Sequence, residues 1–166
     1  MTEHETTMAR LAAEFDELQF DSFSFDDAWR IGQELVAAGR RDNLPIAIDV
    51  TLNGQTLFHA GLPGSSPDND QWIARKNRVV ARFHKSSYYI ATLLKQKEKT
   101  IEEAYGLPRA DYAASGGAVP IRVRGVGVVG TATVSGLRDF EDHAMVADAL
   151  RRHLADGGAA GQSRGA

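Results

Sequence analysis

Ser115-Gly-Gly-Ala-Val-Pro-Ile-Arg-Val-Arg-Gly-Val-Gly-Val-Val-Gly-Thr-Ala-Thr-Val-Ser-Gly-Leu137 is the stretch that decides the fold. Apolar residues alternate with small or polar ones on both sides of Arg124-Gly125, which predicts a β-hairpin with strands at 119–123 and 126–134. We expect one face of this hairpin to be apolar. That face would carry Val119, Ile121, Val123, Val126, Val128 and Val134.

A second hairpin is predicted upstream, where apolar and polar residues alternate over 46–52. Asn53-Gly54 follows directly and is typical of a two-residue type I′ turn. With that turn, His59 is expected opposite Ile48 on the apolar face of the hairpin, and Phe58 on the other face.

Helical spacing of apolar residues accounts for most of the remaining chain. An amphipathic N-terminal helix is expected around Met8, Leu11, Phe15 and Leu18, and further helices at about 25–38, 69–83, 87–99 and 139–154. The expected inward residues are Phe25, Ala28, Trp29, Leu35 and Val36; then Trp72, Ile73, Val79, Val80 and Phe83; then Phe140, Ala144, Ala147, Leu150 and Leu154.

Two tight hairpins that flank a pair of helices predict an antiparallel sheet covered by helices, an α+β fold. We expect a single domain over residues 1–155. The Gly/Ala-rich segment 156–166 is expected to be a disordered tail.

Composition excludes several classes of function. The chain has 166 residues and a net charge of −3, which argues against a nucleic-acid-binding protein. It contains no cysteine, so disulfides, thiolate metal sites and cysteine nucleophiles are absent. No apolar run approaches the roughly 20 residues that span a membrane. We therefore expect a cytoplasmic protein without a membrane partner.

The segments from Ser115-Gly-Gly through Ser135-Gly-Leu, together with Asp142-His143, resemble the haem-degrading/haem-binding domain family. This family includes GlcG-like proteins, HbpS-type sensors and the C-terminal domain of PduO-type proteins. The segment from Trp72 to Ser87 is most similar to an uncharacterised cytosolic branch of it. The resemblance covers about residues 44–154.

This resemblance implies a profilin-like fold, in which a central antiparallel sheet has helices on both sides as three α/β/α layers. It also implies homo-oligomers and, for some members, haem as a ligand. Haem degradation is ascribed to the family by name. The sequence shows no convincing catalytic constellation, so any enzymatic activity would be oxidative chemistry that depends on haem.

Three histidines, His59, His84 and His143, are candidate ligands for haem iron, because neutral imidazole is a common axial ligand. A structural role is the alternative for each of them. His84 is the strongest candidate, since Phe83 and Tyr88 would supply apolar walls beside it.

Lys76 falls in the middle of an apolar helix face, where a lysine is costly unless it is paired or snorkels to solvent. It would hold an anionic group of a ligand, or form an ion pair with Asp49 or Glu102. Arg75 would hold a second anionic group, and its stripe with Arg78 and Arg82 is alternatively a solvated or oligomer-facing surface.

Gly116 and Gly117 would present backbone N–H groups to an anion, although a turn that needs positive φ is the favoured interpretation. Asp142 and His143 are adjacent in a helix, so their side chains diverge by about 100° and do not form a dyad. We expect Asp142 to face outward and His143 inward.

Two functions from different classes remain. The first is a cytosolic homo-oligomer that binds an anionic or tetrapyrrole-like ligand at a pocket facing another subunit. Its candidate residues are His84, Lys76, Arg75, Phe83, Tyr88, Gly116 and Gly117, with no dedicated metal site. The second is a non-catalytic scaffold that binds a protein partner through the N-terminal helix around Leu11 and Phe15.

Overall fold

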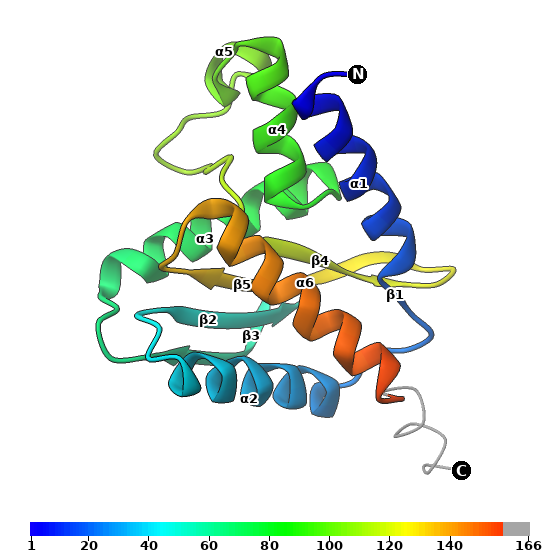
Figure 1. Ribbon diagram of the computed structural model, residues 1–166, viewed down its shortest axis with the longest axis vertical. Helices are drawn as coiled ribbons and strands as arrows, with labels where there is room; N and C mark the ends of the chain where they lie inside the picture. Colours follow the sequence, from blue (N-terminus) through cyan, green and yellow to red (C-terminus); the bar gives the residue numbers. More distant parts are fainter. Residues whose placement is uncertain (158–166) are drawn as a thin grey trace.

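A five-stranded sheet forms the centre of the protein, with the strand order β1-β4-β5-β2-β3. The computed structural model in Figure 1 describes residues 1–157. Its strands are β1 (Gln19–Phe20), β2 (Ala47–Leu52), β3 (Gln55–Gly61), β4 (Ala118–Val123) and β5 (Gly127–Ser135). Both predicted hairpins are present and antiparallel. The sheet is nevertheless mixed, because the two-residue β1, too short for a sequence signal, pairs parallel with β4.

The β2–β3 hairpin confirms the predicted turn but not the predicted faces. Asn53 and Gly54 both have positive φ, as a type I′ turn requires. A β-bulge then shifts the register between Val50 and Thr51, so that His59 lies opposite Asp49. A shift of one residue exchanges the two faces of a strand. The prediction that His59 lies on the apolar face was therefore wrong, and Phe58 takes that place instead.

The β4–β5 hairpin carries a second bulge, between Ile121 and Arg122. Val119, Ile121 and Val134 are buried as predicted. Val126 lies in the connecting turn and is 72% exposed, so the predicted apolar face is shorter than the sequence suggested.

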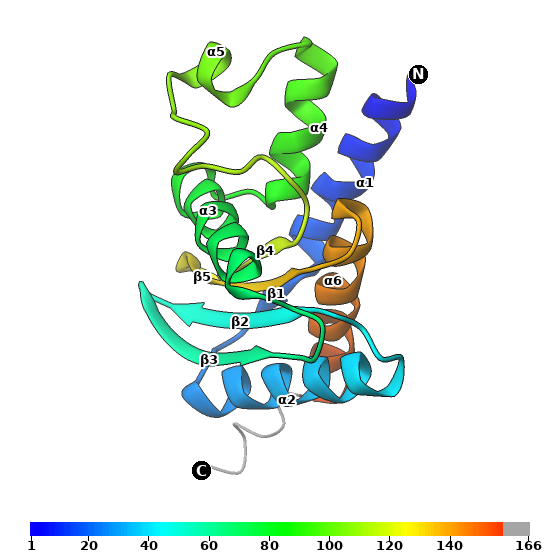
Figure 2. The same ribbon diagram turned by 90° about the vertical axis from the view of Figure 1, so that its left-hand side faces the viewer.

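Helices cover both faces of the sheet, which confirms the three-layer α+β fold. Helices α2 (Phe25–Arg41) and α6 (Asp139–Ala155) pack on one face, and α3 (Pro67–Phe83) packs on the other. Figure 2 shows α3 and α6 on opposite sides of β4 and β5. Helices α1 (Glu3–Glu17), α4 (Ser87–Lys97) and α5 (Ile101–Tyr105) extend the molecule beyond the sheet.

The two faces of the sheet differ in chemistry. The face toward α2 and α6 is apolar and contributes most of the main core: Ile48, Val50, Phe58, Val119, Ile121, Ala132 and Val134. The opposite face carries buried polar residues, among them Asp49, Thr131 and Thr133. Because buried polar groups need partners, this second face is where a polar site can be built.

Helix α2 turns Ala28, Ile31, Gly32 and Leu35 inward rather than its aromatic residues. Phe25 and Trp29 are 59% and 52% exposed, against the prediction that they point inward. Gly32 lies directly under the Phe58 ring, where a Cβ atom would approach to 2.3 Å. The inward face of α2 combines small residues with Ile31 and Leu35, which are fully buried, so only the aromatic residues were a misleading guide to it.

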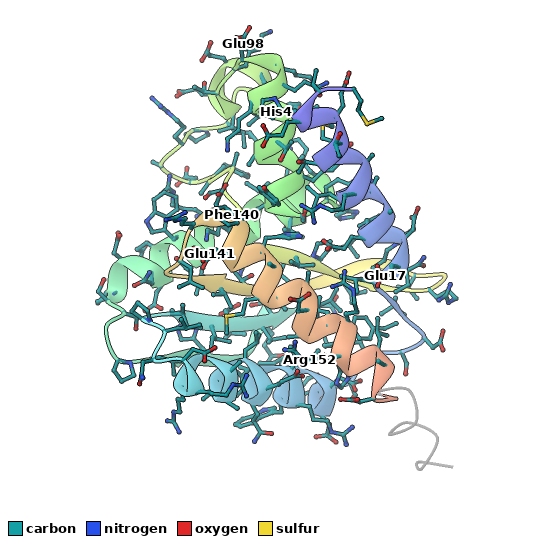
Figure 3. All side chains as sticks on the ribbon, in the orientation of Figure 1. His4, Glu17, Glu98, Phe140, Glu141 and Arg152 are labelled. Atoms are coloured by element: carbon teal, nitrogen blue, oxygen red, sulfur yellow. The ribbon has the colours of Figure 1, made fainter. Side chains whose placement is uncertain are left out.

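Other helix boundaries and faces also differ from the predictions. Helix α2 continues to Arg41, beyond the predicted end at residue 38, and Gly39 is buried within it. In α6, Phe140 is 46% exposed (Figure 3). Ala144 is exposed as well, while His143, Val146, Ala147 and Leu150 are buried. Of the predicted tail 156–166, Asp156 caps α6 and residues 158–166 lie outside the described part of the chain.

Candidate functional site

A cleft of about 450 Å³ opens on the polar side of the sheet, between the C-terminal half of α3 and the turn ends of both hairpins. The β2–β3 hairpin contributes Thr51, Asn53, Gly54 and Thr56 to its walls; α3 contributes Asn77, Arg78, Val80, Ala81 and His84; and β5 contributes Val128, Val129, Gly130 and Thr131. We refer to it as the α3–hairpin cleft.

Both β-bulges occur at this cleft. Val129 is the extra residue of the β4–β5 bulge and lines the cleft, and Leu57 is the extra residue opposite Val50 and Thr51. A bulge bends its strand and increases the local twist, and bulges are frequent next to functional sites. The two bulges therefore bend the strands close to the turn ends that line the cleft.

Thr131 carries an unpartnered hydroxyl in this cleft. The residue is 5% exposed, and its Oγ1 has no hydrogen-bond partner within residues 1–157. An unsatisfied buried hydroxyl costs about 1–3 kcal/mol, and such groups are uncommon in native structures. A polar group supplied from outside the chain would remove this cost.

A polar network fixes the wall of the cleft next to Thr131. The buried carboxylate of Asp49 accepts hydrogen bonds from Thr51 Oγ1 at 2.7 Å and from Asn77 Nδ2 at 3.3 Å. The hydroxyl of Thr133 donates to Asn77 Oδ1 at 2.5 Å. With both ends of its amide engaged, Asn77 has one orientation, so this side of the cleft is preorganised.

His59 belongs to the same network. Its Nδ1 lies 3.1 Å from Asp49 Oδ2, and its Nε2 lies 2.9 Å from Asp70 Oδ1. Burial acts to lower the pKa of His59, but the hydrogen bonds to these two carboxylates outweigh it, and the pKa is raised above 6.5. His59 thus ties the hairpin to the start of α3 and has no nitrogen left for a metal ion.

His84 lies at the rim of the cleft and ends α3. It adopts the left-handed conformation, with φ 54°, and its backbone N–H donates to Val80 O. The side chain is exposed. Arg78, six residues earlier in α3, donates from Nη1 to the carbonyl of Asp111 at 3.0 Å. The cleft thus combines an imidazole, a guanidinium, hydroxyls and an aliphatic wall.

Four of the predicted site residues meet elsewhere, at the start of α6. Lys76 is 2% exposed, and its Nζ donates to Asp142 Oδ2 at 3.1 Å and to Val134 O at 3.3 Å. Gly117 lies against this ammonium group, since a Cβ there would come within 2.7 Å of it. A Cβ at Gly116 would come within 2.3 Å of the Asp139 carbonyl oxygen and within 3.3 Å of Tyr88. The residues of this cluster therefore contact one another and neighbouring parts of the fold.

The partner of Lys76 was not foreseen. Neither Asp49 nor Glu102 pairs with it, and Asp142 is buried rather than outward. Asp142 also accepts from the backbone N–H of Leu137 at 2.9 Å, because the Gly136 turn folds back over it. Desolvation lowers the pKa of Lys76 and raises the pKa of Asp142, opposed in each case by the attraction between the two charges.

The remaining predicted residues do not join either group. Arg75 donates from Nε at 3.0 Å to the carbonyl of Arg109 and stacks on Trp72. The Phe83 ring packs against Tyr105, with centroids 4.8 Å apart. Of the seven predicted ligand contacts, His84 lines the α3–hairpin cleft, Arg75 lines a different cleft, and the others pack inside the fold.

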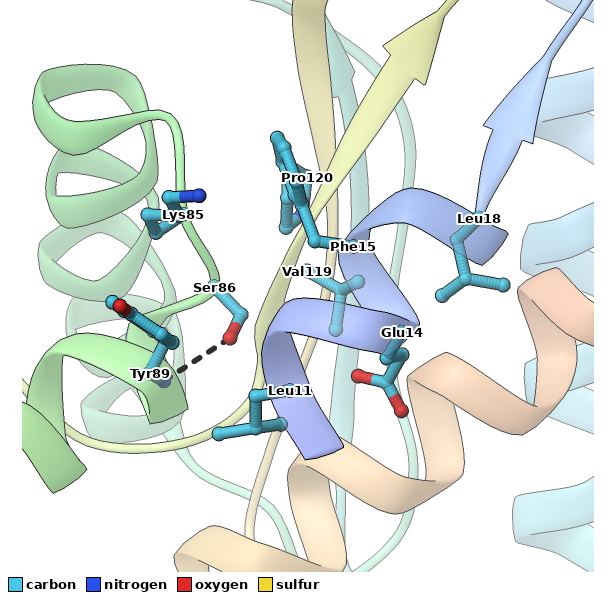
Figure 4. A pocket seen from close by; sticks show the side chains of 9 residues that line it. All are labelled: Leu11, Glu14, Phe15, Leu18, Lys85, Ser86, Tyr89, Val119 and Pro120. Atoms are coloured by element: carbon cyan, nitrogen blue, oxygen red, sulfur yellow. Dashed lines mark hydrogen bonds between the residues drawn. The ribbon is translucent and has the colours of Figure 1, made fainter. Parts of the chain in front are cut away.

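His143 faces inward as predicted and does not pair with Asp142. Its Nε2 lies 2.6 Å from Glu14 Oε1 of α1, so the histidine anchors that helix. Figure 4 shows Leu11 and Glu14 of α1, together with Leu18 directly after it, among the residues that line the small cavity that α1 covers. The apolar side of α1 is thus used within its own chain, which argues against the predicted docking role.

Sequence reasoning missed Thr51, Asn77 and Thr131. A signal was present in β5, where Thr131 and Thr133 alternate with buried apolar residues and so mark a polar sheet face. Within residues 1–157, no group of three acidic or histidine side chains could hold a metal ion. In the same part of the chain, no helix has the length and apolar character needed to cross a membrane.

Comparisons with known proteins agree with the fold. The family model "Haem degrading protein HbpS-like" matches residues 23–151. A UPF0303 protein of Streptomyces avermitilis is 49% identical over 89% of this chain and 91% of its own length. The crystal structure of Ybr137w matches with a TM-score of 0.83 and 33% identity, over 90% of this chain and 89% of its own. The PduOC:Heme complex matches with a TM-score of 0.66 and 14% identity, over 78% and 94%.

Proposed function

The chain belongs to the HbpS-like haem-degrading protein family, and we propose that it is a cytoplasmic homo-oligomer that binds an anionic, tetrapyrrole-like ligand in the α3–hairpin cleft. The observation that carries this proposal is the unpartnered Thr131 hydroxyl, buried in a cleft that also offers Arg78 and His84. Structural likeness to a protein in complex with haem supports the class of ligand.

The residues of the cleft fit haem. His84 would provide an imidazole for the iron, and Arg78 would provide a guanidinium for a carboxylate group. Val80, Val128 and Val129 form an aliphatic wall for the apolar ring. When bound, haem supplies redox chemistry through its iron, and this chain's own residues bind and orient the group.

A haemin titration of the purified protein tests the proposal, with the Soret band as the signal. His84→Ala should abolish or alter the shift of the band. His4→Ala is the matched control, because His4 lies on α1 at the far end of the molecule (Figure 3) and should leave the shift unchanged. Absence of a Soret shift in the unchanged protein would remove haem as the ligand. An identical shift in His84→Ala would remove His84 as the contact.

A non-catalytic scaffold is the second candidate, and one observation favours it. Phe25 and Trp29 are largely exposed on α2, beside the open edge of the sheet at β3. The edge-on contact of Trp29 with Phe58, with centroids 5.3 Å apart, holds this surface rigid. Trp29→Ser should reduce the mass of the assembled particle if copies of the chain associate here. An unchanged mass would rule out this surface as the assembly contact.

A further inference from the structure

A second cleft, of about 520 Å³, lies at the opposite end of α3 from His84. It is bounded by the N-terminal half of α3, the C-terminal half of α4, α5 and the loop 109–115. We refer to it as the α3–α5 cleft. None of its lining residues belongs to the α3–hairpin cleft, so the two clefts can be tested separately.

Apolar side chains form the inner surface of the α3–α5 cleft. Leu94 and Ile101 are buried at its base. Trp72 and Tyr112 stand at its sides, and the Trp72 ring remains partly exposed. An aromatic wall above an apolar base suits a flat ring, because ring stacking combines burial with a specific geometry.

Basic side chains dominate the rim. Arg75, Lys95, Lys99 and Arg109 line the cleft, against the acids Glu98 and Glu103, in a chain whose net charge is negative. Lys95 and Lys99 form no hydrogen bond or ion pair with any side chain in residues 1–157.

The two acids at the rim, Glu98 and Glu103, differ in whether the carboxylate is already hydrogen-bonded within the chain. The Glu103 carboxylate is already engaged, since it accepts the backbone N–H of Thr100 at 3.2 Å in the cap of α5. Hydrogen bonding to Thr100 lowers the pKa of Glu103. Lys99 and Arg109 also attract this carboxylate, and Glu98 is the second acid at the rim.

Arg75 is held in place before any ligand arrives. Both Nε and Nη2 donate to the Arg109 carbonyl, and the guanidinium carbon lies 4.6 Å from the centroid of the Trp72 ring. The third nitrogen, Nη1, has no acceptor within residues 1–157. A fixed guanidinium loses little conformational entropy when it binds an anion, so this donor is preorganised.

We propose that the α3–α5 cleft binds a small phosphorylated molecule with a flat ring, of the nucleoside phosphate type. The ring packs against the face of Trp72 that Arg75 does not cover, and the phosphate lies among Lys95, Lys99 and Arg75. A phosphate carries about 1.5 to 2 negative charges and three acceptor oxygens, which matches two lysines and one arginine N–H better than a single carboxylate does.

Tryptophan fluorescence can test this proposal, because the chain has only two tryptophans. Trp29→Phe leaves Trp72 as the sole indole, in a protein whose α3–α5 cleft is unchanged. Titration with ADP should quench its fluorescence to saturation. Adenosine has the flat ring but no phosphate, and pyrophosphate has phosphate but no ring, so each should bind more weakly than ADP.

The contact between the lysines and the phosphate is tested by combining Lys95→Gln and Lys99→Gln in the Trp29→Phe protein. Loss of two charge-assisted hydrogen bonds should weaken ADP binding by about tenfold or more. Lys97→Gln is the matched control: Lys97 lies on the same helix but over the Tyr105 ring, outside the cleft, and should leave the affinity within about twofold.

Three results would overturn the proposal: no saturable quenching by ADP, equal weakening by Lys97→Gln, or the same quenching by sodium chloride at matched ionic strength. Haemin binding should be unaffected by the Lys95/Lys99 double variant. The failure of this proposal is therefore distinguishable from failure of the α3–hairpin cleft as a haem site.

Discussion

Replacement of Asp142 by alanine should destabilise the protein severely, because it leaves Lys76 as an uncompensated buried charge. Lys76 is 2% exposed, and the Val134 carbonyl would be its only remaining hydrogen-bond partner within residues 1–157, with Asp139 as the remaining attracting charge. Removing one member of a buried ion pair costs about 3–5 kcal/mol. In a domain of this size each kcal/mol shifts the Tm by about 2–4 °C, so we expect Tm to fall by about 10 °C.

Two companion variants separate the charge from the packing. Lys76→Met should cost less than Asp142→Ala, since Asp142 keeps its bonds to the backbone N–H groups of Gly136 and Leu137. Its pKa is also already raised, so it can become neutral. The double variant should be more stable than Asp142→Ala alone, because no buried charge remains.

Urea denaturation and thermal unfolding followed by circular dichroism measure these differences. An Asp142→Ala variant within about 1 kcal/mol of the unchanged protein would refute the reasoning, because it would mean that the Lys76 ammonium is not confined. Strict additivity in the double variant would refute it as well, since coupled groups must show an interaction energy.

Two further predictions concern the polar side of the sheet. The pKa of His59 is raised in the folded protein, so its two carboxylate partners stabilise the fold below pH 6.5, and this stabilisation is lost as pH rises through the folded pKa. His59→Gln should therefore remove this pH dependence of the unfolding free energy. If the dependence persists in the variant, another group causes it. Thr131→Val should raise stability by about 1 kcal/mol in urea denaturation, because it removes an unpaired buried hydroxyl, while it weakens haemin binding. A variant that binds haemin as well as the unchanged protein would show that this hydroxyl does not contact the ligand.

The sequence predicted the architecture because its strongest signals are local. Asn53-Gly54 specifies a type I′ turn by backbone conformation alone, and the structure confirms it. The unexpected position of Lys76 on an apolar helix face was also correctly identified, and the structure explains it by an ion pair. Such signals depend only on neighbours along the chain.

The features that the sequence did not predict depend on tertiary contacts. A bulge at Leu57 has no residue signature, yet it exchanges His59 and Phe58 between the faces of the sheet. The partner of Lys76 is 66 residues away and approaches only when the Gly136 turn has formed. Thr131 became a candidate only when its hydroxyl was found to have no partner within the described residues.

The contact between Lys76 and Asp142 joins two helices that sit on opposite layers of the molecule. Lys76 belongs to α3, Asp142 to α6, and the strand carbonyl of Val134 is held by the same ammonium group. If either helix moved away from the sheet, the ion pair between Lys76 and Asp142 would be broken. Amide hydrogens in the middle of α3 and in the first turns of α6 should therefore exchange with deuterium in one cooperative event, although the two segments share no backbone hydrogen bond.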